Sequence, residues 1–256
     1  MALRQIRNDK ILKIVAPIAF IILFLTAWEL LVIFNNIPGW VIAKPSEIFS
    51  TIIQKFSVDI WPDMWVTLKT VLIAYPIGGI LGIVIAGLFT NSVLVSKAIS
   101  PFITILVCTP MMTLVPLLTI ILGFGLLPRI IVVVIQTMAI TNMNCSVGFL
   151  NVPTERRELM QSLKANRLVT FIKMTVPSSI PGIFTGLRLG FIVCMTTCIG
   201  AEFAGGNNGL GSAIIFNTQF IRLPLAFACI FMVAVIGIIG YNLISLLEHK
   251  IMTWVE

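Results

Sequence analysis

Six long apolar stretches constrain this chain more than any other feature of its sequence. A helix needs on the order of 20 apolar residues to cross a bilayer. The chain offers six such stretches, roughly at residues 14–34, 66–89, 99–124, 130–150, 181–203 and 223–247. Of its 256 residues 58% are hydrophobic and 11% are charged, about half the charged share of a soluble domain. The sequence therefore predicts an all-α, polytopic membrane protein, with six transmembrane helices in a single domain over residues 1–256.

The placement of lysine and arginine predicts the orientation of these spans. The first stretch is longer than the apolar core of a signal peptide, so we expect it to remain as a span. With the N-terminus inside, eleven basic residues fall on the inner side and five on the outer side. Basic residues favour the cytosolic side of a membrane, so both termini are expected to be cytosolic. The net charge of +7 is then explained by topology and by contact with anionic lipid headgroups, and not by nucleic acid.

The outer loop, residues 36–65, contains a second kind of helix. Ser46 follows Pro45 and can cap a helix that begins there. Five apolar side chains then fall on one face: Ile48, Phe49, Ile52, Ile53 and Phe56. This pattern predicts an amphipathic segment at about residues 45–58, lying either on the outer membrane surface or against the bundle.

The inner loop, residues 151–180, is the most informative segment of the chain. Thr154 can cap a short helix over residues 155–165, and a second helix can run from Arg167 to Val176 and end at Pro177. The first helix carries an apolar stripe made of Leu159, Met160 and Leu163. An ordered loop in a chain with little other soluble mass indicates a docking surface. The alternative is a pair of helices lying on the lipid surface.

The same loop resembles the permease subunits of bacterial ATP-binding-cassette importers, in the nitrate, sulfonate and taurine branch. Those subunits carry Glu-Ala-Ala, then a glycine after three further residues, then Leu-Pro about a dozen residues later. The corresponding residues here are Glu158-Leu159-Met160, Lys164 and Val176-Pro177. The resemblance continues through KPSEIF, TLKTVLIAYPIGGILGIVIAGL, TPMMTLVPLLTIILGFG, PGIFTGLRLG and Glu202 with GGNNGLGSAI. It covers nearly the whole chain after residue 27.

The chain departs from the family pattern within this loop. Leu159 and Met160 replace both alanines, and Lys164 replaces the glycine. Lysine adopts a positive φ only at a cost in free energy. We therefore expect the turn either to be built differently or to place Asn166 in the strained position.

The resemblance implies a type I ABC importer permease fold and a set of partners. These are an ABC ATPase dimer, a second permease copy or a paralogue, an extracytoplasmic substrate-binding protein, and the lipid of a bacterial cell membrane. ATP and Mg would be bound by the ATPase, since this chain lacks a phosphate-binding Gly-x-x-x-x-Gly-Lys-Ser/Thr loop. The cargo would be a small anion, a sulfonate or a vitamin precursor. Residues implied in coupling to the ATPase are Glu158, Leu159, Met160, Ser162, Leu163, Lys164, Ala165 and Asn166.

Polar residues within apolar spans, and residues near the Pro110 break, are candidates for the translocation pathway, because polar groups are costly in lipid. These candidates are Thr109, Met112, Thr113, Gln136, Asn142, Thr197 and Glu202. Each reading has an alternative. The polar residues of the fourth span could instead bond neighbouring helices, and Glu202 could simply fix its loop. The position of Glu29 near the outer end of the first span favours a structural role for this carboxylate. Arg188 could extend to the inner surface or attract an anionic substrate.

Small and sulfur-containing residues favour packing roles. Gly78, Gly79, Gly82, Ala86 and Gly87 indicate close helix contacts in the second span. The five cysteines are expected to be reduced, buried and apolar in role: Cys108, Cys145, Cys194, Cys198 and Cys229. No spacing suggests a metal site.

Two other function classes compete with the importer permease. A stand-alone channel or secondary transporter would need no cytosolic docking helix, and charged relays in mid-membrane would be expected. A membrane-embedded enzyme would need a nucleophile–base pair or an acidic metal cluster within the spans. The chain has one histidine, His249, and few carboxylates, which argues against an enzyme.

Overall fold

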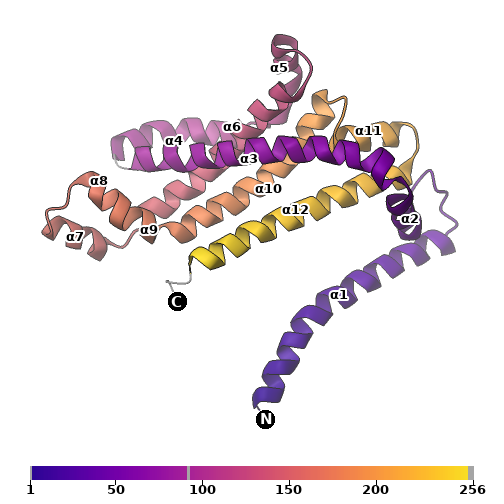
Figure 1. The fold of residues 1–256 in the computed structure, drawn as a ribbon, viewed down its shortest axis with the longest axis horizontal. Helices are drawn as coiled ribbons and strands as arrows, with labels where there is room; N and C mark the ends of the chain where they lie inside the picture. The colour runs from indigo at the N-terminus through magenta and orange to yellow at the C-terminus, as the bar shows by residue number, and fades with distance from the viewer. Residues whose placement is uncertain (1, 91–92, 253–256) are drawn as a thin grey trace. The chain divides into compact units, whose positions relative to one another are not determined.

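The computed structural model describes residues 2–90 and 93–252, and every regular element within these ranges is a helix (Figure 1). Five helices are long and apolar enough to cross a membrane. They lie within α1 (Ala2–Phe34), α3 (Trp61–Thr90), α6 (Leu126–Leu150), α10 (Ile180–Gly205) and α12 (Leu223–Ile251). These helices correspond to five of the six expected spans.

The sixth expected span is broken. Helix α4 (Val93–Cys108) is followed by the 3-10 turn η2 (Met111–Leu114) and by α5 (Val115–Leu122). The two parts meet at an angle of 77°. Pro110 occupies the break, where it lacks an N–H for the helical ladder and its carbonyl accepts from Thr113 N at 2.9 Å. The stretch expected as a span over residues 99–124 is therefore a bent pair of helices, and the pair counts as the sixth span if it is taken as one.

The reversal between α5 and α6 is built on two glycines. It lies at Gly123–Gly125, where Gly123 has φ +83° and Gly125 has φ +154°. These are backbone conformations that glycine adopts without steric cost. Pro128 already belongs to the first turn of α6, a position that tolerates proline because its N–H would have no helical partner.

The chain divides into two compact units. One comprises the chain up to Trp61 together with Ile214–Ile230, and the other comprises Pro62–Ala213 together with the chain from Phe231 on. Each unit is described by itself. The larger unit is called the main unit below, and the smaller one the α1 unit.

The main unit has its core where α6 and α10 pack closely against α3. Val133, Phe191 and Cys194 are among its buried side chains. Cys145, Cys194 and Cys198 are buried here, and Cys229 is buried in the α1 unit, whereas Cys108 is exposed at the end of α4. The expectation that all five cysteines are buried is therefore wrong for Cys108, because the break at Pro110 leaves that end of α4 uncovered.

Glycines let the helices of the main unit approach one another closely. A Cβ at Gly78 would lie 2.8 Å from Thr137 Cβ, and a Cβ at Gly82 would lie 2.7 Å from Thr141 Cβ. Gly190 of α10 meets Thr141 from the other side. The expected packing role of Gly78 and Gly82 is confirmed, because no side chain fits between α3 and α6 at these positions.

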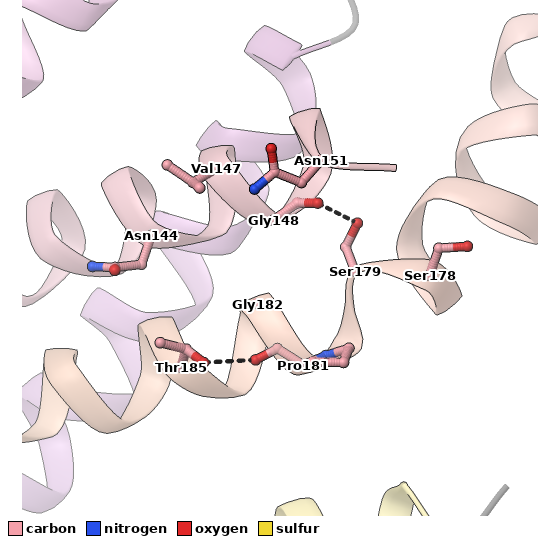
Figure 2. A pocket seen from close by; sticks show the side chains of 9 residues that line it. All are labelled: Asn144, Val147, Gly148, Asn151, Ser178, Ser179, Pro181, Gly182 and Thr185. Atoms are coloured by element: carbon pink, nitrogen blue, oxygen red, sulfur yellow. Dashed lines mark hydrogen bonds between the residues drawn. The ribbon is translucent and has the colours of Figure 1, made fainter. Parts of the chain in front are cut away.

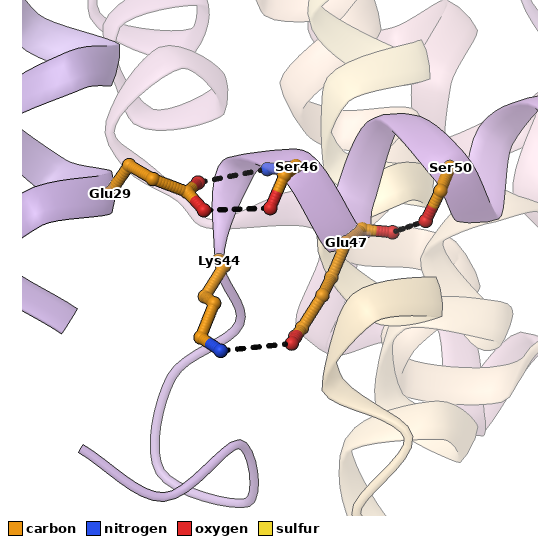
Figure 3. A network of polar contacts seen from close by, with 5 residues as sticks. All are labelled: Glu29, Lys44, Ser46, Glu47 and Ser50. Atoms are coloured by element: carbon orange, nitrogen blue, oxygen red, sulfur yellow. Dashed lines mark hydrogen bonds and ion pairs between the residues drawn. The ribbon is translucent and has the colours of Figure 1, made fainter. Parts of the chain in front are cut away.

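The α1 unit joins α1 to α2 (Pro45–Lys55), which continues into the π-helical turn η1 (Phe56–Ile60). Figure 3 shows the link: Glu29 accepts from Ser46 N at 3.0 Å and from Ser46 Oγ at 2.7 Å. The prediction that Ser46 caps α2 is wrong, because the cap position is Lys44 and Ser46 lies inside the first turn. The Glu29 carboxylate instead accepts from the backbone N–H and the hydroxyl of Ser46 in this first turn. The N-terminal end of a helix such as α2 favours negative charge.

The apolar face of α2 is divided between protein and surroundings. Ile48 is buried, whereas Phe49 is 41% exposed and Ile53 is 82% exposed. The edge that carries Ile48 packs on the unit, and the other edge is left uncovered. The burial of Ile48 agrees with packing against protein, and contact of the uncovered edge with the membrane surface stays a prediction.

Candidate coupling and pathway sites

The loop after α6 forms two helical runs, as its sequence predicts. The first is α7 (Thr154–Ser162), and the second joins α8 (Arg167–Thr170), η3 (Phe171–Thr175) and α9 (Val176–Ser178) without a gap. Two details differ from expectation. Pro153, and not Thr154, occupies the cap position of α7. Pro177 does not end the second run, because it follows a π-helical turn, where the regular hydrogen-bond pattern is already interrupted.

The turn between α7 and α8 places Lys164 in the left-handed conformation, with φ +51°. Lys164 N bonds to Gln161 O at 2.9 Å and Ala165 N bonds to Met160 O at 3.0 Å, which is the Schellman ending of a helix. Asn166 is extended instead, and its Oδ1 accepts from Val169 N at 2.8 Å. Both expectations for this turn are wrong: Lys164 itself takes the position that the family gives to glycine, and Asn166 caps α8.

Two arginines fasten this loop to the rest of the main unit. Arg157 Nη2 donates to the carbonyls of Phe149 and Leu150, at 3.3 and 3.1 Å, at the end of α6. Arg156 Nη1 donates to Ser178 Oγ at 2.8 Å, just before α10. Helix α7 is therefore tied to the end of one long helix and to the start of the next.

The apolar stripe of α7 is only partly covered by the rest of the main unit. Leu159 is 59% exposed and Leu163 is 66% exposed, whereas Met160 is half-buried. The three apolar residues of the expected stripe therefore differ in exposure: the two leucines are largely open and Met160 is partly covered. Of the other residues implied in coupling, Ala165 is half-buried and the following are exposed: Glu158, Ser162, Lys164 and Asn166.

Glu202 lies in a buried polar cluster at the other end of α10. Its side chain is fully buried. Its carboxylate accepts from Thr67 Oγ1, at 2.9 Å to Oε1 and 3.1 Å to Oε2, and Oε2 accepts from Gly211 N at 2.8 Å. Leu210 N bonds to Thr67 Oγ1 at 2.9 Å and Gly209 N to Asp63 Oδ1 at 2.8 Å. The cluster thus receives the first backbone N–H groups of α11 (Leu210–Gln219).

Arg129 completes this cluster from the start of α6. Its side chain is 3% exposed, and it donates to Asn208 O at 2.8 Å and to Asn208 Oδ1 at 3.1 Å. Arg129 is one of the five basic residues expected on the outer side, and nothing in the sequence marks Asp63 or Thr67 as its neighbours. No local pattern links these residues to Glu202, because they lie far apart in the chain.

None of the other pathway candidates lines the groove at the crossing of α6 and α10 that is described below. Gln136, Asn142 and Thr197 are buried. Gln136 Nε2 bonds to Val107 O and Asn142 Nδ2 to Gly82 O, each at 3.3 Å. Three more lie at the Pro110 break: Thr109 is half-buried, while Met112 and Thr113 are exposed. Met112 packs on Gly200, one turn from Thr197.

A polar groove of about 330 Å³ lies where α6 and α10 cross (Figure 2). Gly148 and Gly182 meet at the crossing, and Ser179 Oγ donates to Gly148 O at 2.9 Å. Asn144 of α6, Asn151 just after that helix, and Thr185 of α10 line the groove. All of its lining side chains are uncharged.

The chain also matches a family of transport proteins. Residues 78–253 match the model of the binding-protein-dependent transport system inner membrane component. The chain belongs to this family. It is thus the membrane permease of an ABC transporter, a subunit without catalytic activity whose ATPase is a separate partner.

Similar proteins cover nearly the whole permease. One is a probable ABC transporter permease protein of Haemophilus influenzae, 22% identical over 93% of this chain and 97% of that protein. Another is the formylaminopyrimidine transport permease protein of Halalkalibacterium halodurans, 25% identical over 93% and 95%. The taurine transport system permease protein of Escherichia coli is 23% identical over 94% and 90%. These relatives agree with the branch that the sequence resembles.

Solved structures agree on the fold of the permease. An inward-facing form of the MetNI methionine ABC transporter matches with a TM-score of 0.61 and 17% identity, over 79% of this chain and 99% of that one. The all-α fold of an importer permease, expected from the sequence, is confirmed.

Arg188 of the permease is paired within the main unit. Its Nη1 lies 3.1 Å from Glu248 Oε2, and its Nη2 donates to Glu248 Oε1 at 3.3 Å. This two-point contact holds the end of α12 to α10. The two roles expected for Arg188, extending to the inner surface and attracting an anionic substrate, did not include Glu248 as a partner. A guanidinium paired in this way is not free to attract a substrate.

Glu202→Gln is expected to destabilise the start of α11. The amide would place a donor where Thr67 or Gly211 now donates, and a buried donor left without an acceptor costs about 1–3 kcal/mol. We expect faster hydrogen exchange at the Gly211 amide and a lower unfolding temperature. Ser212→Ala is the control, because it removes the bonds from Ser212 Oγ to Glu202 O and Asn208 O, at 3.0 and 3.2 Å, and leaves the Glu202 carboxylate unchanged. Loss of transport with unchanged exchange at Gly211 would instead assign Glu202 to the pathway.

Proposed function

We propose that this permease forms half of the translocation pathway of an ATP-driven importer and couples to a separate ATPase through α7. The observation that carries the proposal is the pair of outward leucines, Leu159 and Leu163, on a helix fixed by two arginines. Exposed leucines next to one another on a short helix are typical of a segment that inserts into a partner's groove.

The ties of α7 suggest how closure of the ATPases would reach the spans. A displacement of α7 acts on the end of α6 through Arg157 and on the segment before α10 through Arg156. These two helices also touch at Gly148 and Gly182, without intervening side chains. The pair would therefore move with α7 as one body, which suits rocking between inward-open and outward-open states.

The remaining parts of the transporter follow from this role. The loop of residues 151–180 and both termini would be cytosolic, where basic residues are favoured. ATP and Mg would be bound by the ATPase dimer, and a second copy or a paralogue would supply the other half of the pathway. A substrate-binding protein would deliver cargo at the outer face, where α11 is anchored by Glu202.

The cargo would be a small polar solute, either an anion such as a sulfonate or a vitamin precursor. Support comes from relatives whose names specify formylaminopyrimidine, riboflavin, taurine and nitrate transport. The uncharged lining of the groove at the α6–α10 crossing suits solutes recognised by hydrogen bonds.

The test is reconstitution into vesicles with its ATPase and binding protein. Uptake of radiolabelled taurine, nitrate or formylaminopyrimidine should require ATP, the binding protein and the ATPase together. A matched preparation that lacks only the ATPase should show no uptake. Uptake that persists without the ATPase would contradict the proposal and indicate a stand-alone channel or secondary transporter.

A further inference from the structure

A second cavity lies between α7 and the helical run that follows it. It has a volume of about 370 Å³. Its apolar lining comes from Leu159, Met160, Met174 and Pro177, and its two charged lining residues are Arg156 and Lys173. The groove at the α6–α10 crossing has no cation in its lining, so the two cavities differ in chemistry.

The cations of this cavity are not neutralised by carboxylates. None of the lining residues is acidic. Arg156 uses Nη1 to bond to Ser178 Oγ at 2.8 Å, which fixes its guanidinium and leaves further donors available. Within the described part of the chain, Lys173 takes part in no ion pair and no side-chain hydrogen bond. Two cations beside an apolar lining match a ligand with an anionic head and an apolar body.

The position of the cavity relative to the membrane narrows the choice of ligand. Pro177 and Ser178 line it, and α10, a candidate membrane span, begins at Ile180. The cavity is therefore at the end of a span, where lipid headgroups lie. The bond between Arg156 and Ser178 holds one of the two cations at this depth.

We infer that this cavity binds the phosphate of an anionic phospholipid. Arg156 and Lys173 would contact the phosphate, and Met160, Met174 and Pro177 would pack on the glycerol and the first carbons of the acyl chains. Basic residues at the cytosolic end of spans attract anionic lipids, and here the cations and the apolar surface share one cavity. A lipid bound there would contact α7 as well as η3 and α9. The position of α7 would then depend on the anionic lipid content of the membrane.

The experiment counts lipids that remain bound to the purified full-length permease, by native mass spectrometry. Phosphatidylglycerol and phosphatidylcholine are the two probes. The permease should retain phosphatidylglycerol in preference to phosphatidylcholine. Lys173→Gln should weaken this binding about fivefold, the factor that one Lys or Arg contributes at an anionic surface, and Arg156→Gln should act similarly. Arg167→Gln is the matched control, an exposed cation of the same loop outside the cavity, and it should leave retention unchanged.

Three results would overturn the inference. Equal weakening by Arg167→Gln would show a diffuse electrostatic attraction in place of a site. Displacement of phosphatidylglycerol by millimolar inorganic phosphate would show a site for the free anion. Unchanged lipid retention in Lys173→Gln, together with loss of ATPase co-purification, would show that the cavity takes an acidic side chain of the ATPase.

Discussion

Leu163→Asp is expected to abolish co-purification of the ATPase while the permease still inserts into the membrane. Leu163 is 66% exposed at the end of α7, so the folded chain makes little use of it. In a partner's groove its burial would contribute roughly 1.5–3 kcal/mol, and small interfaces depend on a few such residues. Aspartate would both remove this contribution and bury an unpaired charge, which costs several kcal/mol more. We expect the affinity for the ATPase to fall at least about 100-fold.

A control is needed because a carboxylate in the last turn of a helix is itself unfavourable. Gln161→Asp supplies it. Gln161 is exposed in the same turn, and at 100° per residue it lies on the opposite side of α7 from Leu163. This variant should keep the ATPase and its substrate-stimulated hydrolysis. A stoichiometric complex and normal transport in Leu163→Asp would contradict the docking role and favour a helix pair lying on the lipid surface.

The sequence predicts the spans well because the physical constraint behind them is local. Length and hydropathy alone decide whether a helix can cross a bilayer, and the same window of residues contains all the information. The break at Pro110 has only a partial local signal. Proline removes one bond of the helical ladder, but Pro76 and Pro101 lie inside α3 and α4, which continue past them. What the hydropathy of residues 99–124 does not report is how far the two parts bend, which is 77°.

The turn at Lys164 could not be predicted from propensity. Lysine in the left-handed region costs roughly 1–2 kcal/mol. Residue propensity therefore predicts that a different residue of the turn takes the left-handed conformation. The folded loop accepts that cost, because the same conformation completes two backbone bonds, to Gln161 O and Met160 O. Asn166, which tolerates a positive φ better, is needed at the start of α8, where its side chain caps Val169 N.

The contacts of Glu202 could not be predicted from the sequence, for a different reason. A carboxylate in an apolar stretch signals a special role, and this signal was present in the sequence. Its partner Thr67 is 135 residues away, and Arg129 is 79 residues from Asn208. No periodicity in a single sequence connects positions so far apart. The same holds for Arg188, whose partner Glu248 lies 60 residues away.

Gly190→Ala is expected to destabilise the permease strongly, and Thr141→Ala is expected to restore it. A Cβ at Gly190 would overlap Thr141 Oγ1, while the next atoms, Thr141 Cβ and Thr137 Cγ2, lie 3.7 Å away. Overpacking of this kind costs about 1–3 kcal/mol, which corresponds to roughly 5 °C in unfolding temperature. Thr141 Oγ1 is buried without a hydrogen-bond partner in the described ranges. Its removal alone should therefore be close to neutral, and it would leave the new methyl group in ordinary contact.

The comparison of Gly190→Ala, Thr141→Ala and the double variant separates this contact from a general effect of alanine. The measurement is the temperature at which the purified permease loses its monodisperse peak after heating in detergent. Gly237→Ala in α12 is the control, because a Cβ there would meet nothing within 4 Å, and alanine favours a helix over glycine by about 1 kcal/mol. The double variant should unfold close to the parent. If it unfolds as early as Gly190→Ala, the close approach of α10 to α6 at Thr141 is not what excludes a side chain from position 190.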